Sequence, residues 1–268
     1  MALVAEGRSN QAICLLPMTT AACWRYWPTC AARLSMTDNA RTLSDLAGPK
    51  AILFDLDGTL VDTVQVRAEG WRRAFAGIGL AVEIASLLPY MGSDGRWLAG
   101  EVGRAGGREL DWAARDEVDR ASGAIFDQLN ASPATLPAAT ELLTALEASR
   151  IAFAIATASQ PDQVSASVAA LKLPALPRIT DAGHVEHAKP APDLLLASAD
   201  QLGVAPEACW YVGDSTWDML ASVRAGMTGI GVTTGATDAA ALIAAGASVA
   251  MPSLICLQNE LRRRGLID

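Results

Sequence analysis

The chain has 268 residues, of which 51% are hydrophobic, and a formal net charge of −8 at pH 7. This length accommodates one large domain or two smaller ones, each with a substantial core. The negative charge offers no basic field for nucleic acid, and no apolar run reaches the roughly 18 residues that a membrane-spanning helix needs. We therefore expect neither a nucleic-acid partner nor a membrane partner.

The first part of the chain, 1–48, differs in pattern from the rest. Aromatic residues and cysteines crowd between Cys23 and Cys30 without helical or strand periodicity. We expect this extra segment to lie outside the fold and to be poorly ordered, with Met36 as an alternative start, and we disfavour a secretory signal because the apolar run is broken. The five cysteines form no CxxC pair, and their odd number argues against a complete disulfide framework. A reducing, cytoplasmic location is the simpler interpretation.

A buried strand is predicted over 51–54, where four apolar residues run into Asp55, Leu56, Asp57 and Gly58. A continuous apolar run suits a parallel strand covered on both faces by helices, and ligands bind beyond the carboxyl ends of such strands. Gly58 permits a sharp change of direction that brings the second carboxylate toward the first. Taken alone, an acidic pair beside glycine is also typical of a plain turn after an edge strand.

Helical periodicity dominates the next stretch, 64–132, in which no strand is evident. The spacing of its apolar residues predicts helices over about 64–78, 82–89, 94–105 and 109–130. Ser132 and Pro133 then mark a hinge. The sequence therefore predicts an all-helical cap domain, 64–132, inserted after the first strand.

Strands and helices alternate in the remainder of the chain. The predicted strands span 151–156, 178–180, 209–212, 229–232 and 248–251, and the predicted helices span 137–149, 161–171, 192–202 and 217–225. Such alternation is typical of an α/β protein with a doubly wound, mostly parallel, Rossmann-like sheet. The catalytic core is therefore expected to comprise 49–63 and 133–268.

Polar side chains recur where a predicted strand ends or a predicted helix begins: Asp55, Asp57 and Thr59; Thr157 and Ser159; Lys189; and Asp214 and Asp218. In this order the set resembles the four motifs of the haloacid dehalogenase superfamily, which here read DLDGT, TAS, the lysine of HAKPAPD, and GDSTWD. The resemblance covers 51 to about 250. The helical insertion is similar to the helical cap of the phosphoglycolate phosphatase-like branch, and the resemblance implies a phosphoric monoester hydrolase.

The resemblance implies a two-step phosphoryl transfer on Asp55. Asp55 would attack phosphorus and form an aspartyl-phosphate, which water then hydrolyses. Asp57 would be the acid and base, protonating the leaving oxygen and later deprotonating the water. Mg²⁺, a hard cation that prefers oxygen ligands, would lie between Asp55 and Asp214, with the backbone carbonyl of Asp57 as a further ligand. Asp218 would support the site.

The phosphoryl oxygens would be bound by Thr157, Ala158 and Lys189. Considered without the other motifs, Thr157 and Ser159 would cap the helix that begins near Pro161. Lys189 would then be an ordinary surface lysine, held extended by the proline that follows it.

Substrate specificity is expected to come from the cap, which would close over the site and exclude water. In the loop 92–97, Arg96 would grip a carboxylate or a second phosphate of the substrate. The alternative, which stays open, is an exposed arginine beside a helix cap at Asp94. Arg67 on the first cap helix is expected on a solvated face, and Trp112 in the core of the cap.

Departures from neighbouring chemistries narrow the expected function. Dehalogenating relatives generally lack an acid and base at the position of Asp57. Phosphonate-cleaving relatives use a cap lysine, and mutases similar to β-phosphoglucomutase often carry His or Lys in the cap, whereas 64–132 contains neither. We expect a magnesium-dependent phosphatase, monomeric or homodimeric, that acts on a small phosphorylated metabolite, either a carboxylate or a sugar phosphate. A phosphosugar mutase and a non-catalytic phospho-ligand-binding protein are the alternatives.

Overall fold

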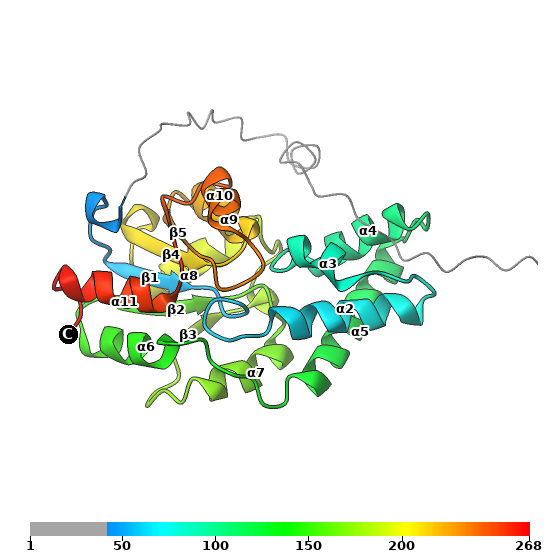
Figure 1. The fold of residues 1–268 in the computed structure, drawn as a ribbon, viewed down its shortest axis with the longest axis horizontal. Helices are drawn as coiled ribbons and strands as arrows, with labels where there is room; N and C mark the ends of the chain where they lie inside the picture. Colours follow the sequence, from blue (N-terminus) through cyan, green and yellow to red (C-terminus); the bar gives the residue numbers. More distant parts are fainter. Residues whose placement is uncertain (1–41) are drawn as a thin grey trace, which may run out of the picture.

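A single parallel sheet forms the centre of the molecule, which a computed structural model describes over 42–268 (Figure 1). Its six strands lie in the order β3-β2-β1-β4-β5-β6, and every neighbouring pair is parallel. The strands are β1 (Ala51–Phe54), β2 (Ala152–Ala156), β3 (Arg178–Thr180), β4 (Cys209–Gly213), β5 (Thr228–Val232) and β6 (Val249–Met251). The predicted doubly wound α/β fold is confirmed, and each strand ends within one residue of its predicted bounds.

Helices cover both faces of the sheet because β1 is apolar at every position. Ile52 and Phe54 point into a core shared with α6, α7 and α11. Ala51 and Leu53 point the other way, into a core shared with α8 and α9. The helices of the two layers are α6 (Ala139–Ala148), α7 (Pro161–Ala170), α8 (Asp193–Leu202), α9 (Thr216–Ala225), α10 (Ala239–Ala244) and α11 (Leu254–Arg263). Two of them, α10 and α11, go beyond the predicted elements.

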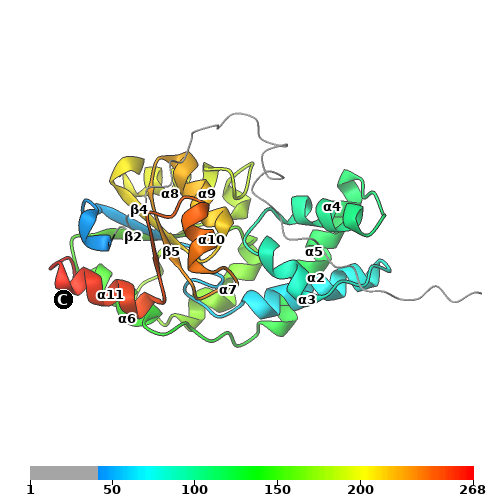
Figure 2. The same cartoon turned by 45° about the horizontal axis from the view of Figure 1, so that its top comes forward.

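A second body of helices lies to one side of the sheet (Figure 2). It consists of α2 (Val64–Gly77), α3 (Ile84–Leu87), the short 3-10 helix η2 (Leu88–Tyr90), α4 (Gly95–Ala105) and α5 (Trp112–Leu129). These helices bury an apolar core of their own, which includes Trp71, Phe75 and Leu98. The all-helical insertion between β1 and β2 is therefore observed, whereas its status as a cap domain with the bounds 64–132 stays a prediction.

The two chain segments that enter and leave the helical body run side by side. The backbone N–H of Asp62 donates to the carbonyl of Ala134 at 2.9 Å, and that of Leu136 donates to the carbonyl of Leu60 at 2.9 Å. The predicted hinge residues, 132–133, directly precede this paired stretch. The chain thus crosses between the core and the helical body through two adjacent segments, and side-chain contacts such as that of Arg67 with Asp57 add to this connection.

The core reaches further toward the N-terminus than the predicted boundary at residue 49. Leu43, in the short 3-10 helix η1 (Leu43–Asp45), is 2% exposed and packs in the same core as Ile52. Arg264 donates to the carbonyls of Leu43 and Leu46, each at 2.8 Å. The rest of the predicted N-terminal segment, 1–41, lies outside the described residues, and so does the alternative start at Met36. Two further 3-10 helices, η3 (Ala182–His184) and η4 (Pro206–Ala208), lie in loops of the core.

Candidate active site

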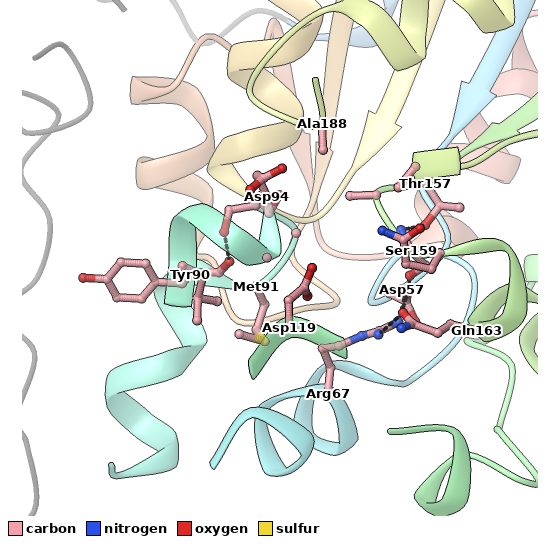
Figure 3. A pocket seen from close by; sticks show the side chains of 18 of the residues that line it. Asp57, Arg67, Tyr90, Met91, Asp94, Asp119, Thr157, Ser159, Gln163 and Ala188 are labelled. Carbon is pink, nitrogen blue, oxygen red and sulfur yellow. Dashed lines mark hydrogen bonds and ion pairs between the residues drawn. The ribbon is translucent and has the colours of Figure 1, made fainter. Parts of the chain in front are cut away.

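One pocket gathers six of the residues that the sequence predicts for the site, namely Arg96 from the insertion and five from the core (Figure 3). It is lined by Asp55, Asp57, Thr157, Ala158 and Asp214. These residues follow β1, β2 and β4, three neighbouring strands of the sheet. Since the carboxyl ends of parallel strands lie at the same edge, the strand order alone brings these side chains together. The opposite wall of the pocket comes from the helical insertion.

Lys189 is fully buried next to the candidate nucleophile. Its Nζ lies 2.5 Å from Oδ1 of Asp55 and 2.8 Å from Oδ1 of Asp218, and none of its surface is exposed. Burial by itself would lower the pKa of Lys189, but the charges of Asp218 and Asp55 raise it above its ordinary value. Lys189 is therefore a fixed positive charge in this site. The alternative of a surface lysine is wrong.

Asp218 holds Lys189 in place and also completes the capping box at the start of α9. Its Oδ1 accepts from Lys189 and, at 3.0 Å, from the hydroxyl of Tyr211. Its Oδ2 accepts from the backbone N–H and the hydroxyl of Ser215, at 2.9 and 2.6 Å. Both oxygens are thus engaged with protein donors, as expected of a supporting residue rather than of a group that contacts substrate.

Asp214 is packed tightly into the same cluster. Its Oδ1 accepts from the hydroxyl of Thr59 at 2.9 Å. A Cβ atom placed on Gly235 would lie 1.7 Å from Oδ2 of Asp214, so a larger residue there would displace this carboxylate. Burial raises the pKa of Asp214 well above its ordinary value, and the negative charges of Asp218 and Asp55 raise it further.

The cluster carries more negative charge than the described protein groups neutralise. Carboxylate oxygens of Asp55, Asp214 and Asp218 all lie within 4.8 Å of one another, and the three residues are buried. Lys189 is the one cationic side chain that contacts this cluster among the described residues. Burial raises the pKa of Asp55 to about 7, although Lys189 opposes this. Oxygen donors with excess negative charge fit a hard divalent cation.

Asp57 is held as an ionised carboxylate by three partners. The hydroxyls of Thr63 and Ser159 each donate to it at 2.5 Å. The guanidinium of Arg67 lies 3.0 Å from its Oδ2 (Figure 3). Burial alone would raise the pKa of Asp57, but the charge of Arg67 and these hydrogen bonds outweigh it, and the pKa is lowered.

The expectation that Arg67 lies on a solvated face is wrong, and so is the alternative that Ser159 only caps α7. The side chain of Arg67 is 14% exposed, so it does not lie on a solvated face of α2. Besides Asp57, it contacts Ser159 at 2.7 Å and Gln163 at 2.6 Å. Ser159 does not cap α7, because the residue before that helix is Gln160. One sequence signal was available for Arg67, namely its position one turn into a helix that begins directly after the DLDGT loop.

Thr157 lies at the end of β2 with its hydroxyl directed at the local backbone. It is 1% exposed, and its Oγ1 accepts from the backbone N–H of Ser159 at 3.2 Å. It does not cap α7 either, for the same reason as Ser159. The hydroxyl hydrogen therefore remains available for a ligand in the pocket that Thr157 lines.

The insertion contributes the wall opposite the carboxylates. Asp94 caps α4, since its Oδ1 accepts from the backbone N–H of Trp97 at 2.8 Å. Arg96 lines the pocket, and its guanidinium carbon lies 5.1 Å from the ring centre of Trp112. Trp112 is 66% exposed, so its prediction as cap core is wrong. Asp119, on α5, also lines this wall and was not predicted from the sequence.

Fold and site together define an α/β enzyme-like protein with a ligand pocket at the carboxyl ends of its strands, built from buried carboxylates and one buried lysine. The family model of the haloacid dehalogenase-like hydrolases matches residues 52–232. The chain therefore belongs to the haloacid dehalogenase-like hydrolase family. This membership confirms the predicted superfamily and the predicted class of enzyme.

Curated relatives align with about two thirds of this chain. Fructose-1-phosphate phosphatase YqaB of Escherichia coli (strain K12) is 27% identical over 186 residues, which are 68% of this chain and 95% of that protein. Hexitol phosphatase A of the same organism is 33% identical over 178 residues, 66% of this chain and 80% of that protein. Among solved structures, a hydrolase from Pseudomonas syringae superimposes with a TM-score of 0.76 at 29% identity, covering 80% of this chain and 98% of that one.

Proposed function

We propose that this protein is a magnesium-dependent phosphatase that hydrolyses a small phosphorylated metabolite through an aspartyl-phosphate on Asp55. The observation that carries the proposal is the ion pair between Asp55 and the buried Lys189, beside the pocket that Asp57 and Asp214 line. An anionic nucleophile approaches an anionic phosphate only where positive charge offsets their repulsion. Membership of the hydrolase family supports the same chemistry.

The phosphoryl group would be held by Thr157, Ala158 and Lys189. Lys189 carries three N–H donors and uses two of them on Asp55 and Asp218, so one remains for a phosphoryl oxygen. The hydroxyl oxygen of Thr157 accepts the hydrogen bond from the backbone N–H of Ser159, so the hydroxyl hydrogen is free to donate to the phosphate. Each of these two side chains thus retains a donor for the phosphate.

Asp57 would serve both chemical steps. In the first, a carboxylate oxygen of Asp55 attacks phosphorus, the bond to the leaving oxygen breaks, and Asp57 gives its proton to that oxygen. In the second, Asp57 takes a proton from water, whose oxygen attacks phosphorus and releases Asp55 and inorganic phosphate. Arg67 favours the ionised form of Asp57, which the second step needs. The first step needs the protonated form instead, so Arg67 must loosen its contact with Asp57 when the ester binds.

Mg²⁺ fits the donors of the carboxylate cluster. Asp55, Asp214 and the backbone carbonyl of Asp57 would hold it, and Asp218 would support them because both its oxygens already accept hydrogen bonds. When bound, the cation supplies positive charge that offsets the repulsion between carboxylates and phosphate.

The substrate would be a carboxylate phosphate or a sugar phosphate, and the names of the two relatives support the second. A phosphosugar mutase would use the same phosphoenzyme, but it would return the phosphoryl group to a hydroxyl. Release of inorganic phosphate from a hexose phosphate, measured against formation of its isomer, distinguishes the two reactions.

We further propose that the protein works in the cytoplasm as a monomer or homodimer. None of the described helices is long and apolar enough to cross a membrane. Cys209 and Cys256, the described cysteines, are both free thiols, which agrees with a reducing compartment.

The test is hydrolysis of 4-nitrophenyl phosphate with and without Mg²⁺. We expect Asp55→Asn to lose at least about 10³-fold in kcat, because the nucleophile is gone. Asp62→Asn is the matched control, since it removes an exposed carboxylate from the same loop and should leave kcat unchanged. Mass spectrometry after acid quenching should find one phosphoryl group on the wild-type peptide that contains Asp55. Full activity of Asp55→Asn would contradict the mechanism.

A further inference from the structure

Asp119 places an acidic side chain in the pocket wall opposite the candidate nucleophile. It lies on α5, and Figure 3 shows its carboxylate directed into the pocket between Met91 and Arg67. A Cβ atom on Gly95 would lie 2.0 Å from Oδ1 of Asp119. The first residue of α4 therefore has to be glycine for this carboxylate to occupy its place.

The nearby arginines are engaged elsewhere. Arg67 pairs with Asp57 at 3.0 Å, and the guanidinium of Arg96 lies over Trp112. Among the described residues, none forms an ion pair with Asp119 within 4.0 Å. Burial raises the pKa of Asp119 to about 6, and the charge of Asp94 adds to this. At neutral pH Asp119 is therefore mostly ionised. It is half-buried, and the charges of Arg96 and Arg67, which form no ion pair with it, offset its own charge only in part.

A substrate must place its leaving group against this wall. With the phosphoryl group at Asp55, the remainder of the ester extends toward the insertion, because Asp55 lines the pocket from the core, after β1, and Asp119 lines it from α5 of the insertion. A carboxylate or a second phosphate there would meet the like charge of Asp119. A hydroxyl would instead donate a hydrogen bond to this carboxylate.

We propose that Asp119 is a specificity-determining residue that favours phosphate esters of hydroxyl-rich, uncharged sugars or polyols over esters whose leaving group carries a carboxylate or a second phosphate. The inference rests on the proposed phosphatase function and selects between its two substrate classes. It also replaces the expectation that Arg96 grips an anionic group, since the charge of Arg96 partly offsets that of Asp119.

The test compares two ligands with the same three-carbon frame. Glycerol 3-phosphate carries a hydroxymethyl group where 3-phosphoglycerate carries a carboxylate. Their dissociation constants are measured by calorimetry with Mg²⁺ on the full-length Asp55→Asn protein, which binds esters without turnover. We expect glycerol 3-phosphate to bind at least about tenfold more tightly than 3-phosphoglycerate.

Variants of Asp119 then test whether its charge causes this difference in affinity. Asp119→Asn keeps the shape and a hydrogen-bond acceptor but removes the charge, so 3-phosphoglycerate should bind about tenfold more tightly while glycerol 3-phosphate changes little. Asp119→Ala, which removes the hydrogen-bond acceptor too, should in addition weaken the binding of glycerol 3-phosphate. Glu117→Gln removes an exposed charge from the same helix and should change neither constant.

The outcomes separate the inference from the proposed function. An affinity ratio that Asp119→Asn leaves unchanged overturns the inference, and so does failure of glycerol 3-phosphate to bind. A role of Asp119 in structure alone would weaken both ligands equally. Loss of the proposed function is read from a different measurement, namely absence of aryl phosphate hydrolysis by the wild-type protein.

Discussion

The guanidinium of Arg67 lies 3.0 Å from the carboxylate of Asp57, and this contact joins the helical insertion to the candidate acid and base of the core. Arg67 belongs to α2, whereas Asp57 follows β1. The same guanidinium stacks on Phe126 of α5, with 3.5 Å between its carbon and the ring centre. One side chain thus links both long helices of the insertion to the pocket.

Arg67→Met should lower stability in a pH-dependent way. The folded-state pKa of Asp57 is lowered, so its stabilising contribution is present above the unfolded value of 3.8 and is lost as pH falls through the folded value. We expect the free energy of unfolding to fall by about 1–3 kcal/mol at pH 7, measured by urea titration, and the difference to shrink below about pH 4. Arg72→Met, at an arginine that is 41% exposed, is the control and should change stability by less than about 0.5 kcal/mol. An equal loss at both pH values would contradict this account.

Lys189→Met should destabilise the protein most at high pH. Without the ammonium, Asp55, Asp214 and Asp218 are buried carboxylates that no cationic side chain within 42–268 contacts. Removal of one partner from a buried pair typically costs about 3–5 kcal/mol. Protonation of the carboxylates relieves this cost, so the loss should be smaller at pH 5 than at pH 8. Urea unfolding of the metal-free protein at the two pH values measures this loss in the free energy of unfolding. Lys50→Met removes an exposed lysine and serves as the control, and a loss independent of pH would argue against an electrostatic cause.

Mg²⁺ should stabilise the protein more at pH 8 than at pH 5. The pKa of Asp55 is raised from 3.8 to about 7, so the stability linked to its protonated form is fully present below about pH 4 and is lost as pH rises through 7. A cation that binds the ionised carboxylates restores the stability that their ionisation removes. At a hundredfold excess over the dissociation constant, binding contributes about 2.7 kcal/mol, or a rise in Tm of roughly 5 °C by thermal denaturation. Asp214→Asn should abolish the rise, and a rise that survives this change would place the cation elsewhere.

Gly235→Ala should remove the Mg²⁺-dependent rise in Tm although it leaves every carboxylate of the cluster in the sequence. Its new methyl group would lie 1.7 Å from Oδ2 of Asp214, so the carboxylate has to move. Gly77→Ala is the matched control, because a Cβ atom there meets no atom within 4 Å and the residue lies at the end of α2. That control should keep the rise in Tm and should not destabilise the protein. Normal Mg²⁺ stabilisation of Gly235→Ala would mean that Asp214 tolerates displacement.

Local sequence pattern determined the positions of the strands and the residues of the site that follow them. Most strands are short, mainly apolar runs bounded by polar or turn residues, so their positions could be predicted within one residue; the short β3, with Arg178 and Thr180 at its ends, is the exception in pattern. Asp55, Thr157 and Asp214 follow directly after strands, and a parallel sheet brings such positions to one edge. Lys189 could be assigned only through the family resemblance, since a lysine before proline has no local signal for burial.

Only the tertiary structure decided how the insertion meets this edge. Arg67 and Asp119 lie on amphipathic helices where a charged residue is ordinarily solvated, and docking of the insertion turns both toward the pocket. Gly235 and Asp214 are 21 residues apart in the chain and meet because β4 and β5 are neighbours. Helical periodicity specifies which face of a helix is apolar but not which body that face will meet. For this protein, the sequence therefore determined the residues at the strand ends, and the fold decided which partners surround them.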